Sequence, residues 1–174
     1  WYFDAALYAS SHNLMLGTSP TEFSPNITMT RGMLVTVLYR MNGSPSVSGK
    51  TPFTDVRTDE WYSAAVLWAY QNGIVTGMSD TTFDPINNVT REQMATILFR
   101  YTKTAAPDKA KASADLSGFA DAGSVNDWAV DAMRWAVGQK LIAGITLEQS
   151  VYLQPRGNAT RAQAATVLTR YTAE

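Results

Sequence analysis

The sequence predicts an all-α protein built from three helix-loop-helix repeats, and three observations lead to this prediction. The same residue types recur in three copies along the 174 residues. Within each copy, apolar residues recur with the 3.6-residue period of an amphipathic helix. Threonine N-caps and glycine turns mark where the helices begin and end. Because one copy of about 43 residues is too small to bury a core alone, we expect the copies to share a core in which the second helices meet.

The repeat is defined by tryptophan, glycine, threonine and arginine at matched positions. Each glycine follows its tryptophan by sixteen positions, and an arginine follows each threonine directly. The matched sets are Trp1, Trp61 and Trp128; Gly17, Gly77 and Gly144; Thr30-Arg31, Thr90-Arg91 and Thr160-Arg161; and Arg40, Arg100 and Arg170. The third copy has three extra residues between Gly144 and Leu153.

This spacing predicts a single domain over residues 1–174. Its parts are the repeats 1–43, 53–103 and 119–174 and the loop-like linkers 44–52 and 104–118. A short lead, Phe53-Thr54-Asp55-Val56, precedes Trp61, and a similar one precedes Trp128. The first copy has no such lead, so we expect the chain to be part of a larger protein.

The second copy shows both helices of the repeat. The first helix places Trp61, Ala65, Trp68 and Ala69 on one face, and Gly73 is its C-terminal cap. The second helix has Thr90 as N-cap, and Gln93 three positions later completes a capping box. Its apolar stripe consists of Met94, Ile97, Leu98 and Tyr101.

The first copy departs from this pattern at the start of its second helix. Met33 stands where the other copies have glutamine, so it cannot close a capping box. Gly32 in the first turn costs up to about 1 kcal/mol of helix stability.

Composition excludes several functional classes. With 14 basic and 15 acidic residues the formal charge is −1, which argues against a nucleic-acid partner. Cysteine is absent and His12 is the single histidine, so thiol chemistry and Cys/His metal sites are excluded. No apolar run reaches the ~18 residues of a membrane span, and we expect no membrane insertion. No catalytic set recurs, so we expect no enzymatic activity, metal or organic cofactor.

Arginine directly after the N-cap is unfavourable, because the positive end of a helix dipole prefers an acidic residue by ~0.3–1 kcal/mol. Arg31, Arg91 and Arg161 all occupy this position. One explanation is an anion held jointly by free backbone N–H groups and the guanidinium. The other is an ion pair with a carboxylate of a neighbouring repeat, such as Asp55 or Asp121. The residues alone leave both explanations open, and one arginine could serve both.

The repeated tryptophans and glycines also have two interpretations each. Trp1, Trp61 and Trp128 could stack on sugars, although their spacing favours a position in the core or at the domain rim. Gly17, Gly77 and Gly144 could bring backbone close to a ligand, or they could simply supply turns that need positive φ. The third set of arginines, Arg40, Arg100 and Arg170, lies near helix C-termini, where a cation is favourable without any functional role.

Taken together, the three copies resemble S-layer homology domains. The motifs that carry the resemblance are Met29-Thr30-Arg31-Gly32-Met33, Val89-Thr90-Arg91-Glu92-Gln93 and Ala159-Thr160-Arg161-Ala162-Gln163. The resemblance covers essentially the whole chain. It implies a pseudo-threefold module around a central bundle with one helix per repeat, and binding grooves between the repeats. It also implies an extracellular location, where the module anchors an exported protein to the bacterial wall through an acidic secondary polysaccharide carrying pyruvate.

On this basis we expect a non-catalytic anchoring module whose nine repeated arginines, glycines and tryptophans line the ligand grooves. The ligand carboxylate would pair with Arg31, Arg91 and Arg161. The family usually has glutamate where this chain has Met33, Gln93 and Gln163, and we expect the groove of the first repeat to bind most weakly. The alternatives are a structural or oligomerisation module of a surface layer, and direct binding to peptidoglycan.

Overall fold

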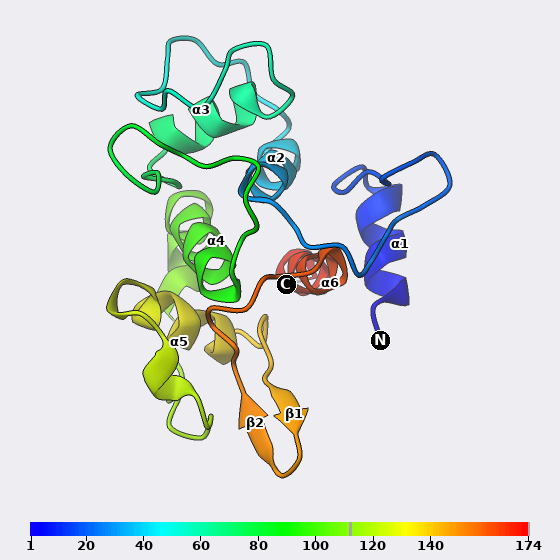
Figure 1. The fold of residues 1–174 in the computed structure, drawn as a ribbon, viewed down its shortest axis with the longest axis vertical. Helices are drawn as coiled ribbons and strands as arrows, with labels where there is room; N and C mark the ends of the chain where they lie inside the picture. The colour runs from blue at the N-terminus through cyan, green and yellow to red at the C-terminus, as the bar shows by residue number, and fades with distance from the viewer. Residues whose placement is uncertain (112, 174) are drawn as a thin grey trace.

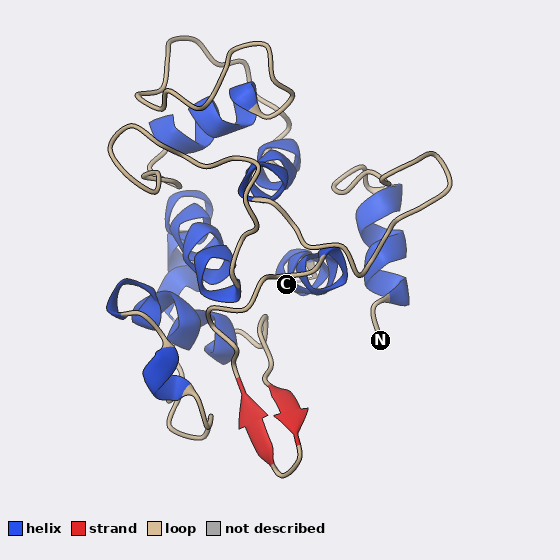
Figure 2. Ribbon diagram, in the orientation of Figure 1, coloured by secondary structure: helices blue, strands red, loops and turns tan. Residues whose placement is uncertain are grey.

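The computed structural model describes residues 1–111 and 113–173 and is mainly helical, as expected (Figures 1 and 2). The first helices of the repeats are α1 (Phe3–Ser11), α3 (Ser63–Gln71) and α5 (Val130–Gly138). The second helices are α2 (Arg31–Met41), α4 (Arg91–Ala105) and α6 (Arg161–Thr172). Three short 3-10 helices are η1 (Pro107–Lys111), η2 (Ala122–Ser124) and η3 (Asp127–Ala129). Within the described residues, no helix is both long and apolar enough to cross a membrane.

A β-hairpin in the third repeat corrects the all-α prediction. Strands β1 (Ile145–Leu147) and β2 (Ser150–Tyr152) pair antiparallel, with Thr146 opposite Val151. The hairpin lies in the segment between Gly144 and Leu153 that holds the three extra residues, and Figure 2 shows it extending away from the helices. A strand pair of three residues each is too short to give a period-2 signal in the sequence.

Helices pack mainly between repeats rather than within them. The first helix of one repeat lies against the second helix of the preceding repeat, giving the pairs α2–α3 and α4–α5. The pattern closes on itself, because α1 packs against α6 at the other end of the chain. Figure 1 shows α2, α4 and α6 nearly end-on near the middle of the molecule, with α1, α3 and α5 outside them. The helices of one repeat therefore do not form a self-contained hairpin, and each repeat depends on its neighbours.

The apolar stripes of the second helices form the core, as the period predicts. In α4, Met94 and Leu98 are fully buried and Tyr101 is nearly so. Tyr101 lies 6.0 Å from the ring of Tyr171 on α6, and the Tyr171 hydroxyl accepts a hydrogen bond from Thr102. These contacts join two second helices directly, as expected of elements that share a core.

The predicted N-caps are present in all three second helices. The hydroxyl oxygens of Thr30, Thr90 and Thr160 each accept a hydrogen bond from the backbone N–H three residues later. Gln93 and Gln163 close capping boxes, whereas Met33 does not. The sequence therefore specifies these helix starts through local chemistry.

Other boundaries differ from the prediction. Helix α3 begins at Ser63, so Trp61 lies before the helix rather than inside it. Gly73 lies two residues beyond the end of α3 with φ +67°, the conformation of a glycine that terminates a helix. Helix α4 continues to Ala105 and η1 follows it, so the segment 104–118 is less loop-like than expected.

A closed cycle of backbone hydrogen bonds joins the three segments that precede the second helices. Met29 N–H donates to Ala159 C=O at 2.8 Å, Ala159 N–H to Val89 C=O at 2.9 Å, and Val89 N–H to Met29 C=O at 2.8 Å. All three side chains are fully buried. Each repeat therefore donates to one neighbour and accepts from the other, which places the starts of α2, α4 and α6 around one point.

Candidate binding site

The three arginines after the N-caps are buried and bind backbone in another repeat. Arg31, Arg91 and Arg161 are each 5% exposed. Their Nε atoms donate to the carbonyls of Phe83, Leu153 and Phe23 at 2.8, 2.7 and 2.9 Å respectively. Because these acceptors lie in the second, third and first repeats, the arginines join all three repeats in a second cycle, which runs in the opposite direction to the backbone cycle of Met29, Ala159 and Val89.

Two of the arginines make a second bond of this kind. The Nη2 of Arg91 donates to Ala143 C=O at 3.1 Å, and that of Arg161 donates to Leu16 C=O at 2.6 Å. The Arg31 guanidinium carbon lies 4.7 Å from the centre of the Phe83 ring, a cation–π distance. Burial lowers the pKa of all three arginines below their ordinary value, but arginine still carries its charge.

The expected ion pairs with Asp55 and Asp121 do not form. The Asp55 carboxylate accepts hydrogen bonds from the backbone N–H groups of Phe83 and Asp84. Asp121 accepts in the same way from Leu153 N–H at 2.7 Å and from the next residue. Arginine and aspartate thus bind the same loop residue in each case: the aspartate accepts from its backbone N–H, and the arginine donates to its C=O. Within residues 1–111 and 113–173, no carboxylate oxygen comes within 4.0 Å of a nitrogen of the three arginines.

The backbone N–H groups at the helix starts are not free to hold an anion either. The expectation that an anion is held jointly by these groups and the guanidinium is therefore wrong for the N–H groups. At the start of α4, Arg91 N–H donates to Gly157 C=O and Glu92 N–H to Pro155 C=O, both at 2.9 Å. The third N–H group, that of Gln93, donates to the N-cap threonine. Equivalent bonds form at the starts of α2 and α6. The positive end of each helix dipole therefore binds carbonyls of the adjacent repeat, and only the guanidinium remains for a ligand.

Three grooves lie between the repeats, and they bring together all nine residues singled out in the sequence. Of these nine residues, each groove contains one arginine, one glycine and one tryptophan, and the three come from three different repeats. The Arg31 groove is lined by Arg31, Gly77, Gln93, Thr96, Arg100 and Trp128. The Arg91 groove is lined by Arg91, Gly144, Gln163, Thr166, Arg170 and Trp1. The Arg161 groove is lined by Arg161, Gly17, Met33, Thr36, Arg40 and Trp61.

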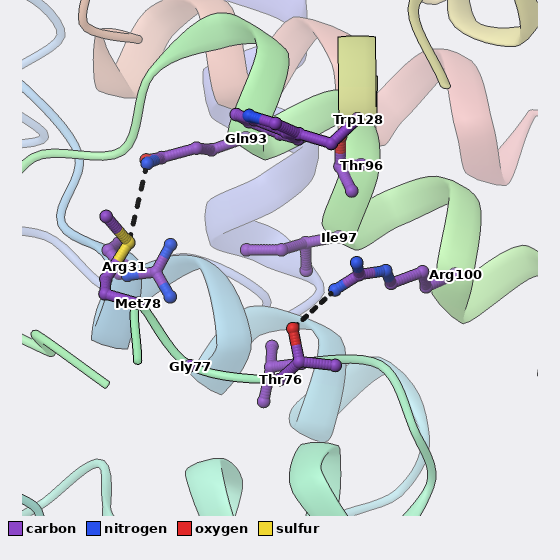
Figure 3. A pocket seen from close by; sticks show the side chains of 10 residues that line it. Arg31, Thr76, Gly77, Met78, Gln93, Thr96, Ile97, Arg100 and Trp128 are labelled. Atoms are coloured by element: carbon purple, nitrogen blue, oxygen red, sulfur yellow. Dashed lines mark hydrogen bonds between the residues drawn. The ribbon is translucent and has the colours of Figure 1, made fainter. Parts of the chain in front are cut away.

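Figure 3 shows the Arg31 groove from close by. Arg31 and Arg100 extend from opposite sides toward Ile97, and Trp128 and Gly77 lie at opposite ends of the groove. Arg100 donates to the Thr76 hydroxyl at 3.3 Å. No carboxylate of the described residues pairs with either arginine, so two cations face one cavity of about 340 Å³.

The tryptophans lie at the groove edges and not in the core. Trp1, Trp61 and Trp128 are 83%, 57% and 54% exposed. Of the two positions that their spacing favoured, the core is therefore wrong, and an edge position agrees with the domain rim. The buried tryptophans of α3 and α5 are Trp68 and Trp135. An exposed indole beside an arginine offers a flat apolar face to a ligand in the groove.

The glycines are required by close packing, and only one of them needs a positive φ. Gly77 has φ +84°, and a Cβ there would lie 2.5 Å from the Phe53 ring. A Cβ on Gly144 would lie 2.8 Å from the Phe119 ring, and one on Gly17 would lie 2.5 Å from Ser19 C=O. The expectation of a turn with positive φ holds at Gly77 alone. The leads of repeats two and three thus pack their phenylalanines directly against the groove glycines.

The second arginine of each groove has a role that the sequence interpretation missed. Arg40, Arg100 and Arg170 line the grooves, although a helix C-terminus alone explains a cation there. The helical period of the sequence could have shown that these arginines share a helix face with other groove residues. Gln93, Thr96 and Arg100 lie at positions i, i+3 and i+7, which places them along one face of α4.

The grooves differ in size and lining. The Arg161 groove has a volume of about 140 Å³, against about 340 and 450 Å³ for the Arg31 and Arg91 grooves. Met33 replaces glutamine in the lining of the Arg161 groove. The Arg91 groove is extended by Ile145 at the start of the hairpin.

Within the described residues, no group of three or more histidine, cysteine, aspartate or glutamate side chains could hold a metal ion. His12 lies at the end of α1, where its exposed ring stacks on Tyr8 at 4.0 Å between centroids. It lines none of the three grooves.

The chain matches a known domain family and parts of several longer bacterial proteins. A family model described as the S-layer homology domain matches residues 52–95 and 118–165. The chain is 29% identical to an amylopullulanase of Thermoanaerobacterium thermosulfurigenes and 32% identical to an endoglucanase of Bacillus sp. (strain KSM-635). Both alignments cover 97% of this chain, but only 9% and 17% of those proteins. A surface-layer 125 kDa protein of Lysinibacillus sphaericus is 31% identical over 88% of this chain and 12% of its own length. The chain therefore spans less than a fifth of the length of these relatives.

Proposed function

Because the chain belongs to the S-layer homology domain family, we propose that it anchors a larger exported protein by binding an acidic wall polysaccharide in its inter-repeat grooves. The S-layer homology domain is a binding module, and the surface-layer relatives place the chain outside the cell, in the bacterial wall or surface layer. We further propose that this region has no catalytic activity of its own and needs no cofactor. The enzymatic activities named for two relatives would then belong to other parts of those proteins.

One observation carries the proposal: each groove contains two arginines with no carboxylate partner among the described residues. A buried cation without a direct ion pair is unfavourable, so a ligand carboxylate in the groove would be favoured. Asp84 and Asp55 act on Arg31, and Asp121 acts on Arg91, only from beyond ion-pair distance. Arg31, Arg91 and Arg161 use Nε for the protein backbone, which fixes the guanidinium plane while other N–H groups remain for the ligand. A ketal-linked pyruvate supplies such a carboxylate, and the tryptophan beside it could contact the sugar ring.

Contacts between the repeats also support the predicted pseudo-threefold arrangement. The cyclic hydrogen bonds among Met29, Val89 and Ala159 and the closing pair α1–α6 favour a pseudo-threefold arrangement of the three repeats around α2, α4 and α6. We propose that residues 1–174 act as one such module. Each groove would then be complete only when all three repeats are present.

Replacing Arg100 by alanine is expected to weaken binding to wall sacculi on the order of tenfold, because one of the two groove cations is lost. Co-sedimentation of the purified chain with native sacculi measures this. Arg100 is the better test residue, since Arg31 and its equivalents also hold the repeats together. The only hydrogen bond of its side chain within the described residues is to Thr76, so the fold should remain intact.

Lys103→Ala is the matched control, because it removes the same charge one turn further along α4, outside every groove. Sacculi stripped of their secondary polymer provide the second comparison, and the proposal predicts that binding is lost on stripping. Equal binding to stripped sacculi would identify peptidoglycan as the receptor. No binding to either preparation would favour the structural or oligomerisation module.

The structure changes how the expected weakness of the first repeat must be tested. Its helix α2 lines the groove that contains Arg161 and Trp61, whereas Arg31 belongs to the groove built on α4. We therefore expect Trp61→Ala to reduce sacculus binding less than Trp128→Ala, because the Arg161 groove is smaller and has Met33 in place of glutamine. The same co-sedimentation assay ranks the two variants. A larger loss for Trp61→Ala would contradict this ranking.

A further inference from the structure

Glu92 is a buried carboxylate that no cation neutralises. It is the second residue of α4 and is only 2% exposed. Its Oε2 accepts a hydrogen bond from Asn126 N–H at 3.0 Å, and its Oε1 accepts one from Asn126 Nδ2 at 2.5 Å. Within the described part of the chain, no lysine or arginine nitrogen lies within 4.0 Å of it. Its charge lies in the first turn of α4, where the helix dipole favours a carboxylate, and its two hydrogen bonds hold Asn126 against the start of this helix.

Asn126 begins the segment that carries Trp128. It is the N-cap residue of η3, and its carbonyl accepts from Ala129 N–H at 2.8 Å. An asparagine at this position usually caps the helix with its own side chain, yet here the side chain donates to Glu92 instead. Ala129 is fully buried, so the backbone on both sides of Trp128 is held. The exposed indole of Trp128 then leaves this fixed backbone toward the Arg31 groove (Figure 3).

The other two grooves lack this arrangement. The residues equivalent to Glu92 are Gly32 and Ala162, which have no carboxylate. At Gly32 a Cβ would lie 2.9 Å from Pro85 C=O and 3.4 Å from Tyr62, so the large side chain at that junction comes from the incoming segment. The counterpart of Asn126 before Trp61 is Asp59, which pairs with Arg57 at the surface and makes no bond to α2.

From these contacts we infer that Glu92 is a positioning residue that presets Trp128 across the Arg31 groove and makes that groove the tightest of the three for an acidic glycan. The claim about glycan binding rests on the proposed function. The claim that Glu92 positions Trp128 does not depend on it. A preset aromatic face binds more tightly because less side-chain and loop freedom is lost on binding. The three repeats are thus unequal by sequence, and the inequality comes from a residue that does not touch the ligand.

The first experiment measures the positioning without any ligand. In a Trp1→Ala, Trp61→Ala background, the remaining tryptophans are Trp128 and the buried Trp68 and Trp135. Time-resolved fluorescence anisotropy then reports the motion of the one exposed indole. Glu92→Ala should increase its fast component at least twofold, because Asn126 is released. Glu92→Gln should leave it closer to the parent value than Glu92→Ala does, since the amide oxygen still accepts from Asn126 N–H. A rotated Asn126 amide can also accept from Nε2, with loss of the 3.4 Å bond that Asn126 Oδ1 accepts from Arg156.

The second experiment measures affinity in the same background with secondary polysaccharide released from wall sacculi. Glu92→Ala should weaken the binding detected through Trp128 five- to tenfold, and Glu92→Gln should restore most of it. Asp131→Ala is the matched control, because it removes an exposed carboxylate three residues after Trp128 and should change neither readout. Circular dichroism confirms that each variant is folded; alanine at the position of Glu92 is the residue that the third repeat has at Ala162.

The anisotropy and affinity results test the role of Glu92 and the proposed glycan binding separately. Unchanged anisotropy in Glu92→Ala would overturn the positioning role. A larger fast component of the anisotropy decay with unchanged affinity would overturn the claim that positioning makes this groove the tightest. If the parent protein does not bind the polysaccharide, the proposed function fails and the tightest-groove claim falls with it, while the anisotropy arm still decides whether Glu92 positions Trp128.

Discussion

Replacing Arg91 by alanine is expected to lower the free energy of unfolding by about 3 kcal/mol, because two charge-assisted hydrogen bonds between repeats are lost. The acceptors are the carbonyls of Leu153 and Ala143, at 2.7 and 3.1 Å. Leu153 is fully buried, so water cannot easily replace the missing donor. Urea unfolding followed by circular dichroism measures the change, with an unaltered dependence on urea expected if the native fold is retained.

Two arginines serve as controls for this prediction. Arg134 donates through Nε to Ala114 C=O at 3.0 Å, but it is exposed, so Arg134→Ala should cost well under about 1 kcal/mol. Arg31→Ala should fall between the two, since within the described residues Arg31 makes one such bond. A loss for Arg91→Ala no larger than that for Arg134→Ala would show that the inter-repeat bonds contribute little.

This structural role changes what an arginine substitution says about binding. An alanine at Arg91 removes both a groove cation and a bond between repeats, so reduced wall binding has two causes. The sequence left open a ligand, a link between repeats, or both, as the explanation of the misplaced arginines. The structure shows the link plainly, with carbonyl acceptors in place of the expected carboxylates. The ligand role is therefore best tested through the second arginine, Arg100.

Local features of the fold could be predicted because their causes are local. The caps at Thr90 and Thr160 follow from a hydroxyl and a glutamine three positions later. The buried stripe of α4 follows from the helical period. The partner of each helix could not be predicted this way, because a period identifies the apolar face but not what packs on it. The closing contact of α1 with α6, at least 150 positions away, has no local signal.

In the candidate site, too, the members could be predicted from the sequence, but their partners from other repeats could not. Recurrence identified Gly77, Trp128 and Arg31 as members of repeated sets, but recurrence alone does not say which members share a groove. That depends on the cyclic order of the repeats, which puts residues from three different copies into each groove. Arg100 was missed because the helix dipole already accounted for a cation at its position. The free N–H groups expected at the helix starts were lost to carbonyls such as Pro155 that are distant in sequence.

Replacing Gly77 by alanine is expected to lower the free energy of unfolding by about 3 kcal/mol and to distort the Arg31 groove. Its φ of +84° costs an L-residue about 1–2 kcal/mol. A Cβ would also lie 2.5 Å from both the Phe53 ring and Ser79 C=O, and overpacking of this kind costs about 1–3 kcal/mol. Thermal or urea unfolding measures the total, and the loss of sacculus binding through this groove should accompany it.

Gly73→Ala separates the two contributions, because Gly73 has a similar φ of +67° but nothing lies within 4 Å of its Cβ position. It should lose about 1 kcal/mol through backbone strain alone, and the remainder at Gly77 would measure the contact with the lead that carries Phe53. Adding Phe53→Ala to Gly77→Ala should then recover part of the groove geometry, although it removes a buried ring. Equal losses for the two glycine variants would mean that backbone conformation, and not the close packing of the lead against the groove, explains the recurrent glycine.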